Sequence, residues 1–358
     1  GAGHMSDEVL DRFVKSYIES VTGDEVVFSW QGGEPTLLGL DFFRKVVAFQ
    51  QRHAKGGQRI ENDLQTNGTM LDEDWARFLK QHRFLVGLSI DGPREIHDHY
   101  RITKRAEPTF DKVFAAAKML HKHGVRFNTL TCVHRYNASK PLDVYRFLRR
   151  EVGSTYIQFI PIVEIKGFEN IAPGAWDTAN LPIVGDPRCH PDHPESVVTP
   201  WSVAADEYGY FLCKIWDEWQ SRDVGKVLIN LCETIVAQHM GLQSQVCVHS
   251  EICGKGVALE HSGDAYSCDH YVYPEYKLGN IRGRSLGDMV FSPRQVKFGY
   301  AKSESLPAYC RQCQFLTDCW GECPKNRLLR TPDGEPGLNY LCPGLKRFFA
   351  HAVPTADM

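Results

Sequence analysis

Apolar positions in the first half of the chain follow two alternating patterns. Short β-branched or apolar runs predict strands over Val26–Trp30, Asp63–Thr66, Val86–Ile90, Phe127–Val133 and Tyr156–Pro161. Amphipathic stretches between them predict helices over Asp7–Ser20, Leu40–His53, Asp72–Gln81, Phe110–His123 and Pro141–Glu151. Alternation at this spacing indicates parallel strands joined by crossover helices. A barrel and a doubly wound sheet fit this alternation equally well.

The pattern changes in the second half of the chain. Gly167–Pro200 is rich in Pro, Gly, Asn and Asp, which is typical of a long excursion. Trp201–Ser221 and Lys226–Met240 predict two further helices. From Cys247 onward the periodicity fades into turns and cysteines, with a β-hairpin expected around Gly263. A cysteine-rich segment with little periodicity is usually held together by a metal.

Charge and hydropathy exclude several classes of partner. The net charge of −3 gives no reason to expect nucleic acid. No apolar run approaches the roughly 18 residues that a membrane span needs. No secretory signal opens the chain, and Gly1–Met5 (GAGHM) is expected to be a tag remnant. We therefore expect a cytoplasmic protein with no membrane partner.

Eight of the twelve cysteines crowd into the last third of the chain, as C247-x5-C253-x14-C268, then C310-x2-C313-x5-C319-x3-C323, then C342. A secreted disulfide framework fits poorly, because the chain is long and carries no export signal. Zinc ions and iron–sulfur clusters both accept four thiolates, so spacing alone leaves both open. The four earlier cysteines, Cys132, Cys189, Cys213 and Cys232, are expected to be small core residues.

Polar residues gather at the ends of three predicted strands. Gln31–Pro35 (QGGEP) follows the first strand, Asn67 lies at the end of the second in LQTNGTML, and Ser89 lies in the third, VGLSIDGP. Parallel α/β folds build their sites at the carboxyl ends of strands.

These segments, together with the cysteine spacing, resemble the anaerobic sulfatase-maturating enzymes, which are radical-SAM proteins with a SPASM domain. The likeness runs from about Asp7 to Cys342. It implies an α/β fold: a partial (β/α)6 radical-SAM barrel, without its first strand and cluster loop, plus a C-terminal cysteine-rich SPASM domain. We expect the partial barrel in residues 6–165, a linker excursion with helices in 166–240, and the SPASM auxiliary-cluster domain in 241–358.

The resemblance implies two auxiliary [4Fe–4S] clusters. The first would be held by Cys247, Cys253, Cys268 and Cys323, and the second by Cys310, Cys313, Cys319 and Cys342.

The resemblance also implies an S-adenosylmethionine site formed by Gly32, Gly33, Glu34, Asn67 and Ser89. For Asn67 and Ser89, ordinary turn and capping roles remain the alternative. Gln31 would face the substrate. Asp269, which follows Cys268, would be the catalytic base, although position alone favours a hydrogen-bond acceptor beside a ligand.

The family reaction oxidises a cysteine or serine of an unfolded sulfatase polypeptide to Cα-formylglycine, with flavodoxin or ferredoxin as electron donor. A third [4Fe–4S] cluster, bound by a CxxxCxxC loop, is needed in the complete enzyme. The sequence contains no CxxxCxxC, so we expect the chain as given to be inactive. The alternatives are a SPASM maturase of another ribosomal peptide and a zinc-stabilised protein-binding module.

Overall fold

The computed structural model describes residues 3–356. Of the expected tag remnant, Gly1 and Ala2 lie outside the described residues. The chain forms two compact units. The first unit comprises the residues up to Ser89, Asp111–Asn128 and Lys255–Gly299, and the second comprises Ile90–Phe110, Thr129–Gly254 and the residues from Tyr300 onward.

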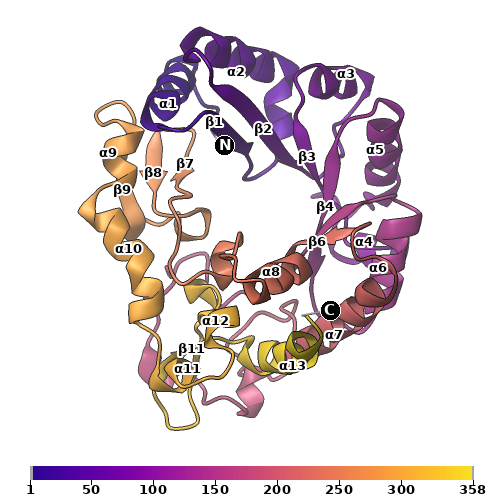
Figure 1. Ribbon diagram of the computed structural model, residues 1–358, viewed down its shortest axis with the longest axis vertical. Helices are drawn as coiled ribbons and strands as arrows, with labels where there is room; N and C mark the ends of the chain where they lie inside the picture. The colour runs from indigo at the N-terminus through magenta and orange to yellow at the C-terminus, as the bar shows by residue number, and fades with distance from the viewer. Residues whose placement is uncertain (1–2, 357–358) are drawn as a thin grey trace. The chain divides into compact units, whose positions relative to one another are not determined.

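The first unit begins as a βα-repeat structure and ends in a small sheet (Figure 1). Its helices and strands are α1 (Asp7–Ser20), β1 (Glu25–Trp30), α2 (Gly39–His53), β2 (Arg59–Thr66), α3 (Glu73–Gln81), β3 (Leu85–Ser89), β7 (Ala258–Leu259), β8 (Asp264–Tyr266), β9 (Lys277–Asn280) and α9 (Leu286–Val290). Helix α5 (Phe110–Lys122), strand β4 (Phe127–Val133) and helix α10 (Pro293–Glu304) each cross a boundary between the units.

Strands β1, β2 and β3 pair in parallel in the order of the chain. Trp30 lies opposite Leu64, and Thr66 lies opposite Leu88. The carboxyl ends of these strands therefore meet at one edge of the sheet. Burial alternates along β1, so Val26, Phe28 and Trp30 point into the core while the residues between them face outward.

Segments far apart in the sequence share one core of the first unit. Ser6 caps α1 by accepting a hydrogen bond from the Val9 amide, and α1 buries its apolar face. That face packs against β8, β9 and α9, and the shared cluster contains Val9, Ala265, Leu278, Ile281, Leu286 and Met289. Figure 1 shows the indigo α1 beside the orange α9. The part of the cysteine-rich segment that contains Cys268 therefore folds with the start of the chain.

The second unit carries the remaining elements. They are α4 (Arg94–Tyr100), α6 (Pro141–Arg150), β5 (Tyr156–Pro161), α7 (Ala205–Arg222), β6 (Leu228–Ile229), α8 (Asn230–His239), α11 (Ala308–Arg311), α12 (Leu316–Cys319), β10 (Leu329–Arg330), β11 (Pro336–Leu338) and α13 (Cys342–Ala352). Strands β4, β5 and β6 pair in parallel, again in chain order, and β10 pairs with β11 in antiparallel fashion.

Helices α7 and α13 pack together through two glycines. A Cβ atom on Gly344 would overlap the carbonyl oxygen of Ala205, and one on Gly209 would meet the Gly344 backbone. The two backbones touch at this crossing, and only glycine permits that approach. The contact fixes the start of α13, where Cys342 lies.

The predicted elements of the first half are confirmed, with boundaries shifted by a few residues. The hairpin around Gly263 is confirmed as β7–β8, and Gly263 has a φ of 87°. The helix predicted over Lys226–Met240 is wrong at its start, because Leu228–Ile229 forms a short strand beside β5. The cysteine-rich third is more regular than expected, since it contains helices α10 and α13. Within residues 3–356, no helix is both long enough and apolar enough to cross a membrane.

Candidate active site and cluster ligands

The turn after β1 is open and depends on its glycines. Gly32 and Gly33 have φ angles of 90° and 53°, a region that side chains with a Cβ rarely adopt. Both are exposed, and a Cβ on either would meet no atom within 4 Å. The glycines are therefore required by the backbone conformation. They leave the backbone of this turn accessible to a ligand.

Glu34 forms the centre of a hydrogen-bonded group that we call the strand-end site, made of Glu34, Thr36, Thr66 and Asn67. Its Oε1 accepts bonds from the Thr36 amide at 3.0 Å, the Thr36 hydroxyl at 2.6 Å and the Thr66 hydroxyl at 2.7 Å. Its Oε2 accepts a bond from the Asn67 amide at 2.7 Å. Among the described residues, Oε2 takes this single bond and so keeps acceptor capacity for an ammonium donor.

Asn67 and Ser89 lie at the same edge as Glu34. Asn67 follows the end of β2, and Ser89 ends β3 one residue after the partner of Thr66. The Asn67 Oδ1 accepts bonds from the Thr69 amide at 2.9 Å and the Thr69 hydroxyl at 2.8 Å, so this oxygen serves the local turn. The structure thus places both residues where the sequence predicted. Their role as cofactor ligands stays a prediction.

The expected base and the expected substrate contact touch each other within the first unit. Gln31 Nε2 donates to Asp269 Oδ2 at 3.3 Å, although the two residues are 238 positions apart in the chain. The Cys268 thiol donates to Asp269 Oδ1 at 3.1 Å. Both Gln31 and Asp269 are exposed. An accessible carboxylate oriented by an amide donor is suited to accept a proton from a bound molecule.

Four of the predicted ligands line one cavity of the second unit. Cys310, Cys313, Cys319 and Cys342 line it together with Leu316, Leu345 and Phe349. We call this the thiol cavity. Four thiols around one apolar cavity supply the donor set of a [4Fe–4S] cluster, and zinc accepts the same four thiolates.

The thiols of Cys319 and Cys342 in this cavity have raised pKa values, so they are hard to ionise without a metal. Burial, together with the neighbouring Cys342 and Cys310 thiols, raises the pKa of Cys319 to about 12. Burial also raises the pKa of Cys342 to about 12, with Cys310 and Cys313 contributing. Because a metal binds the thiolate, these ligands must lose their protons on binding.

The other predicted ligand set is divided between the units. Cys247, Cys253 and Cys323 belong to the second unit, whereas Cys268 belongs to the first. Burial raises the pKa of Cys253, and the nearby Cys247 thiol raises it further. The assignment of these four cysteines to one cluster stays a prediction.

All twelve cysteines lie in the described part of the chain, and none forms a disulfide. The prediction that the four earlier ones are core residues is correct for Cys213 and Cys232, which are buried. Cys132 and Cys189 are only partly buried. Cys132 has a further role, because its sulfur accepts a hydrogen bond from Arg101 at 3.3 Å.

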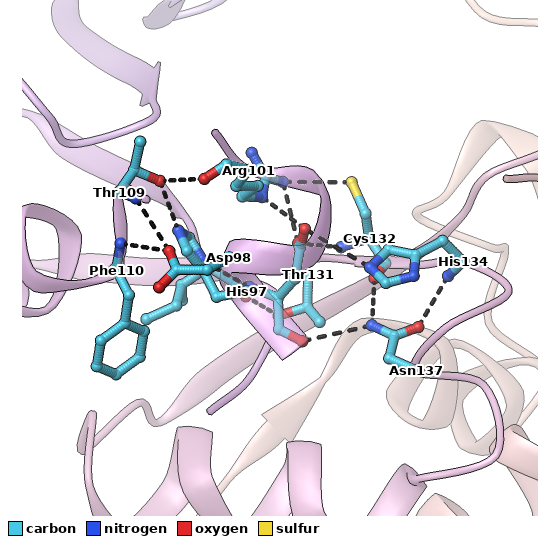
Figure 2. A network of polar contacts seen from close by, with 11 residues as sticks. His97, Asp98, Arg101, Thr109, Phe110, Thr131, Cys132, His134 and Asn137 are labelled. Atoms are coloured by element: carbon cyan, nitrogen blue, oxygen red, sulfur yellow. Dashed lines mark hydrogen bonds and ion pairs between the residues drawn. The ribbon is translucent and has the colours of Figure 1, made fainter. Parts of the chain in front are cut away.

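Sequence reasoning missed a buried polar network that joins the loop after β3 to the end of β4 in the second unit (Figure 2). Asp91 is 2% exposed and binds Arg101 through two bonds of 2.6 and 3.0 Å. Asp91 Oδ1 also accepts a bond from the Cys132 amide at 2.9 Å, while Asn137 Nδ2 donates to the Cys132 carbonyl at 2.8 Å. Asp91 lies in the SIDGP segment that the sequence singled out, but the sequence gives no sign of its ion pair with Arg101.

His134 completes this network as a neutral side chain. Burial lowers its pKa to about 4, even though Asp91 favours the charged form. Its backbone amide donates to Asn137 Oδ1 at 2.8 Å. The network fastens the loop after β3 to the end of β4, so we assign it a structural role.

Family models match two parts of the chain. The model of the radical SAM superfamily matches residues 1–148, and the model of an iron–sulfur cluster-binding domain, SPASM, matches residues 247–314. The fold is therefore an α/β radical-SAM partial barrel with six parallel strands plus a C-terminal SPASM domain, as predicted.

Curated relatives match nearly the whole chain. A serine-type anaerobic sulfatase-maturating enzyme of Bacteroides thetaiotaomicron is 44% identical over 99% of this chain and 82% of its own length. A cysteine-type anaerobic sulfatase-maturating enzyme of Clostridium perfringens is 32% identical over 98% of this chain and 88% of its own length.

Solved structures agree with these sequence matches. Native anSMEcpe with bound AdoMet and Cp18Cys peptide is 31% identical, with a TM-score of 0.83 over 98% of this chain and 90% of that one. Streptococcus suis SuiB bound to S-adenosylmethionine is 12% identical with a TM-score of 0.56, over 89% of this chain and 66% of that one. The second likeness shows the shared fold alone.

Proposed function

This chain belongs to the anaerobic sulfatase-maturating enzymes, and from that premise we propose that it serves the oxidation of a sulfatase cysteine or serine to Cα-formylglycine. The observation that carries the proposal is the hydrogen bond between Gln31 and Asp269. This bond joins the turn after β1 to the segment that follows Cys268, and both of its residues are exposed.

The strand-end site would hold the methionine end of S-adenosylmethionine. The Thr36 and Thr66 hydroxyls donate to one oxygen of the Glu34 carboxylate and hold the side chain in one orientation. The direction of its second oxygen is therefore set as well. The open turn at Gly32 and Gly33 allows close approach of the cofactor. When bound, S-adenosylmethionine and the iron–sulfur clusters would supply a 5′-deoxyadenosyl radical and an electron acceptor.

Asp269 would take the proton from the substrate thiol or hydroxyl. Gln31 would orient the Asp269 carboxylate by donating a hydrogen bond to Asp269 Oδ2, and it would face the incoming polypeptide. The substrate would be an unfolded sulfatase segment, because an extended polypeptide can present its target side chain to the exposed Asp269 carboxylate. A flavodoxin or ferredoxin would supply electrons.

The test is an assay of the longest natural form of the protein with S-adenosylmethionine, a reductant and two sulfatase peptides, one with cysteine and one with serine at the target. We expect mass spectrometry to show an aldehyde in place of the thiol or hydroxyl. Asp269→Asn should lower the rate by about 10²–10⁴-fold, the usual contribution of a general base. Glu275→Gln, an exposed carboxylate of the same unit, should leave the rate unchanged.

Two results would overturn parts of this proposal. An unchanged rate in Asp269→Asn would remove the base from Asp269. Unmodified peptides in the presence of fully loaded clusters would contradict formylglycine formation and would favour a maturase of another ribosomal peptide.

A further inference from the structure

A buried charged side chain of the second unit has no predicted role that accounts for it. Lys302, on α10, is 1% exposed. Lysine is almost never this buried unless its charge is compensated, because removing an ammonium from water is costly. The partners of Lys302 therefore indicate what the protein gains from it.

Those partners are the backbone carbonyls of the loop that begins with Cys247. Lys302 Nζ donates to the carbonyl oxygens of Cys247 at 2.6 Å, Val248 at 2.9 Å and Ser250 at 2.5 Å. Three carbonyls require three N–H donors, and only the charged ammonium has three. Lys302 is thus present as a cation, and it fixes the backbone of this loop.

The position of Lys302 is itself fixed by a second buried cation. Arg327 is 5% exposed and donates to the Lys302 carbonyl oxygen at 2.8 Å and to the Ser305 hydroxyl at 2.9 Å. The thiols close enough to interact electrostatically with Lys302 are Cys253, Cys247 and Cys323. These are the three predicted ligands of the first cluster that belong to this unit.

We propose that Lys302 is a positioning residue that holds the Cys247 loop and supplies a fixed positive charge that makes the cluster bound by Cys247, Cys253 and Cys323 easier to reduce. The inference rests on the proposed assignment of these cysteines to a cluster. Reduction adds one negative charge to a cluster, and a cation in surroundings of low dielectric stabilises that charge. The thiols with the largest electrostatic interactions with Lys302 are those of Cys253, Cys247 and Cys323, so we expect the strongest effect on the cluster that they bind.

The experiment compares three variants in a Cys319→Ala background, which leaves one predicted cluster. Lys302→Met removes the charge and the hydrogen bonds. Lys302→Gln removes the charge but keeps two N–H donors, whereas Lys302→Arg keeps the charge. Lys166→Met is the control, because Lys166 Nζ donates to the Pro194 carbonyl at 3.1 Å on an exposed surface. Iron and sulfide are counted, and the reduction potential is measured by an anaerobic titration followed by electron paramagnetic resonance.

In the neutral variants we expect at least a tenfold fall in the ratio of reduced to oxidised cluster at a fixed applied potential. For one electron, tenfold corresponds to about 59 mV towards more negative potential. Lys302→Arg and Lys166→Met should stay within threefold of the parent. Loss of the cluster from both neutral variants with retention in Lys302→Arg would also support the proposal, because the missing charge is what those two share.

An unchanged ratio in both neutral variants would overturn the proposal, and so would loss of iron from all three Lys302 variants. Failure of the proposed function is recognised separately. If the parent chain binds no iron, the cluster assignment itself is wrong, whatever the Lys302 variants do.

Discussion

The strand-end site and the thiol cavity are built on opposite principles. At the strand-end site the protein itself fixes the carboxylate: Thr36, Thr66 and Asn67 donate four hydrogen bonds to Glu34. In the thiol cavity four cysteines line one space among apolar side chains, and burial keeps the thiols of Cys319 and Cys342 neutral.

This difference separates a site that is organised by the chain from one that is completed by its metal. A carboxylate that already accepts four bonds keeps its position when no cofactor is bound. Neutral thiols are weak hydrogen-bonding groups, so the cavity gains most of its cohesion when they ionise and bind. We therefore expect loss of a cavity ligand to lower the metal content of the protein. Loss of a hydrogen bond at the strand-end site should instead lower the free energy of unfolding.

The largest effect is expected from removing one cavity ligand. Cys319→Ala should lower the iron content from about eight to about four per chain, since each cubane needs four iron atoms. Cys213→Ala removes a buried cysteine outside the cavity and should keep all the iron. Retention of full iron content in Cys319→Ala would show that the cavity is not a cluster site.

Adding a methyl group at the glycine contact between α7 and α13 should have the next largest effect. Gly344→Ala places a methyl against the Ala205 carbonyl, so α7 and α13 must separate. Overpacking of this kind costs about 3 kcal/mol, measured as the free energy of unfolding in urea. Gly283→Ala, where a Cβ meets no atom within 4 Å, is the matched control. Equal stability of the two variants would contradict the close packing of these helices.

The pH dependence of thiol reactivity sharpens the comparison. In the metal-free protein, raising the pKa of Cys319 from 9.0 to about 12 lowers its thiolate fraction about a thousandfold below pH 9. A more basic thiolate is also a stronger nucleophile, which offsets part of the fall in thiolate fraction. Alkylation of Cys319 should therefore be about fiftyfold slower than in the unfolded chain. The rate should rise with pH up to about 12. Mass-spectrometric alkylation at several pH values measures it, and a rate that levels off near pH 9 would refute the shift.

The smallest effect is expected at the strand-end site. Glu34→Gln has one oxygen for four donors, so its amide group must face either the Asn67 amide or the two threonines. Leaving one buried donor unsatisfied costs about 1–2 kcal/mol in the free energy of unfolding. Iron content should not change. A variant that loses iron but keeps its stability would reverse the contrast between the two regions.

The sequence predicted the regular first half well, because strand and helix periodicities are local. The short strand Leu228–Ile229 was missed, since it exists only through its pairing with β5. The packing of the Cys268 segment against α1 could not be predicted from local patterns either, because it depends on contacts between residues about 270 positions apart, such as Ser16 with Leu286.

The candidate site shows the same division. Glycines, thiols and the GGEP turn are recognisable as motifs, so their positions were predicted. The partners that hold them were not: Thr36 and Thr66 are ordinary residues until their hydroxyls are seen to bind Glu34. Lys302 likewise gives no signal in the sequence, because a lysine on an amphipathic helix is normally exposed.

The most direct test of the account is to purify the chain without oxygen, reconstitute it, and count iron, sulfide and zinc per polypeptide. The account predicts about eight iron atoms with matching sulfide, which corresponds to two cubane clusters. About two zinc ions without sulfide would contradict it, because the cysteine-rich third would then be a structural zinc module.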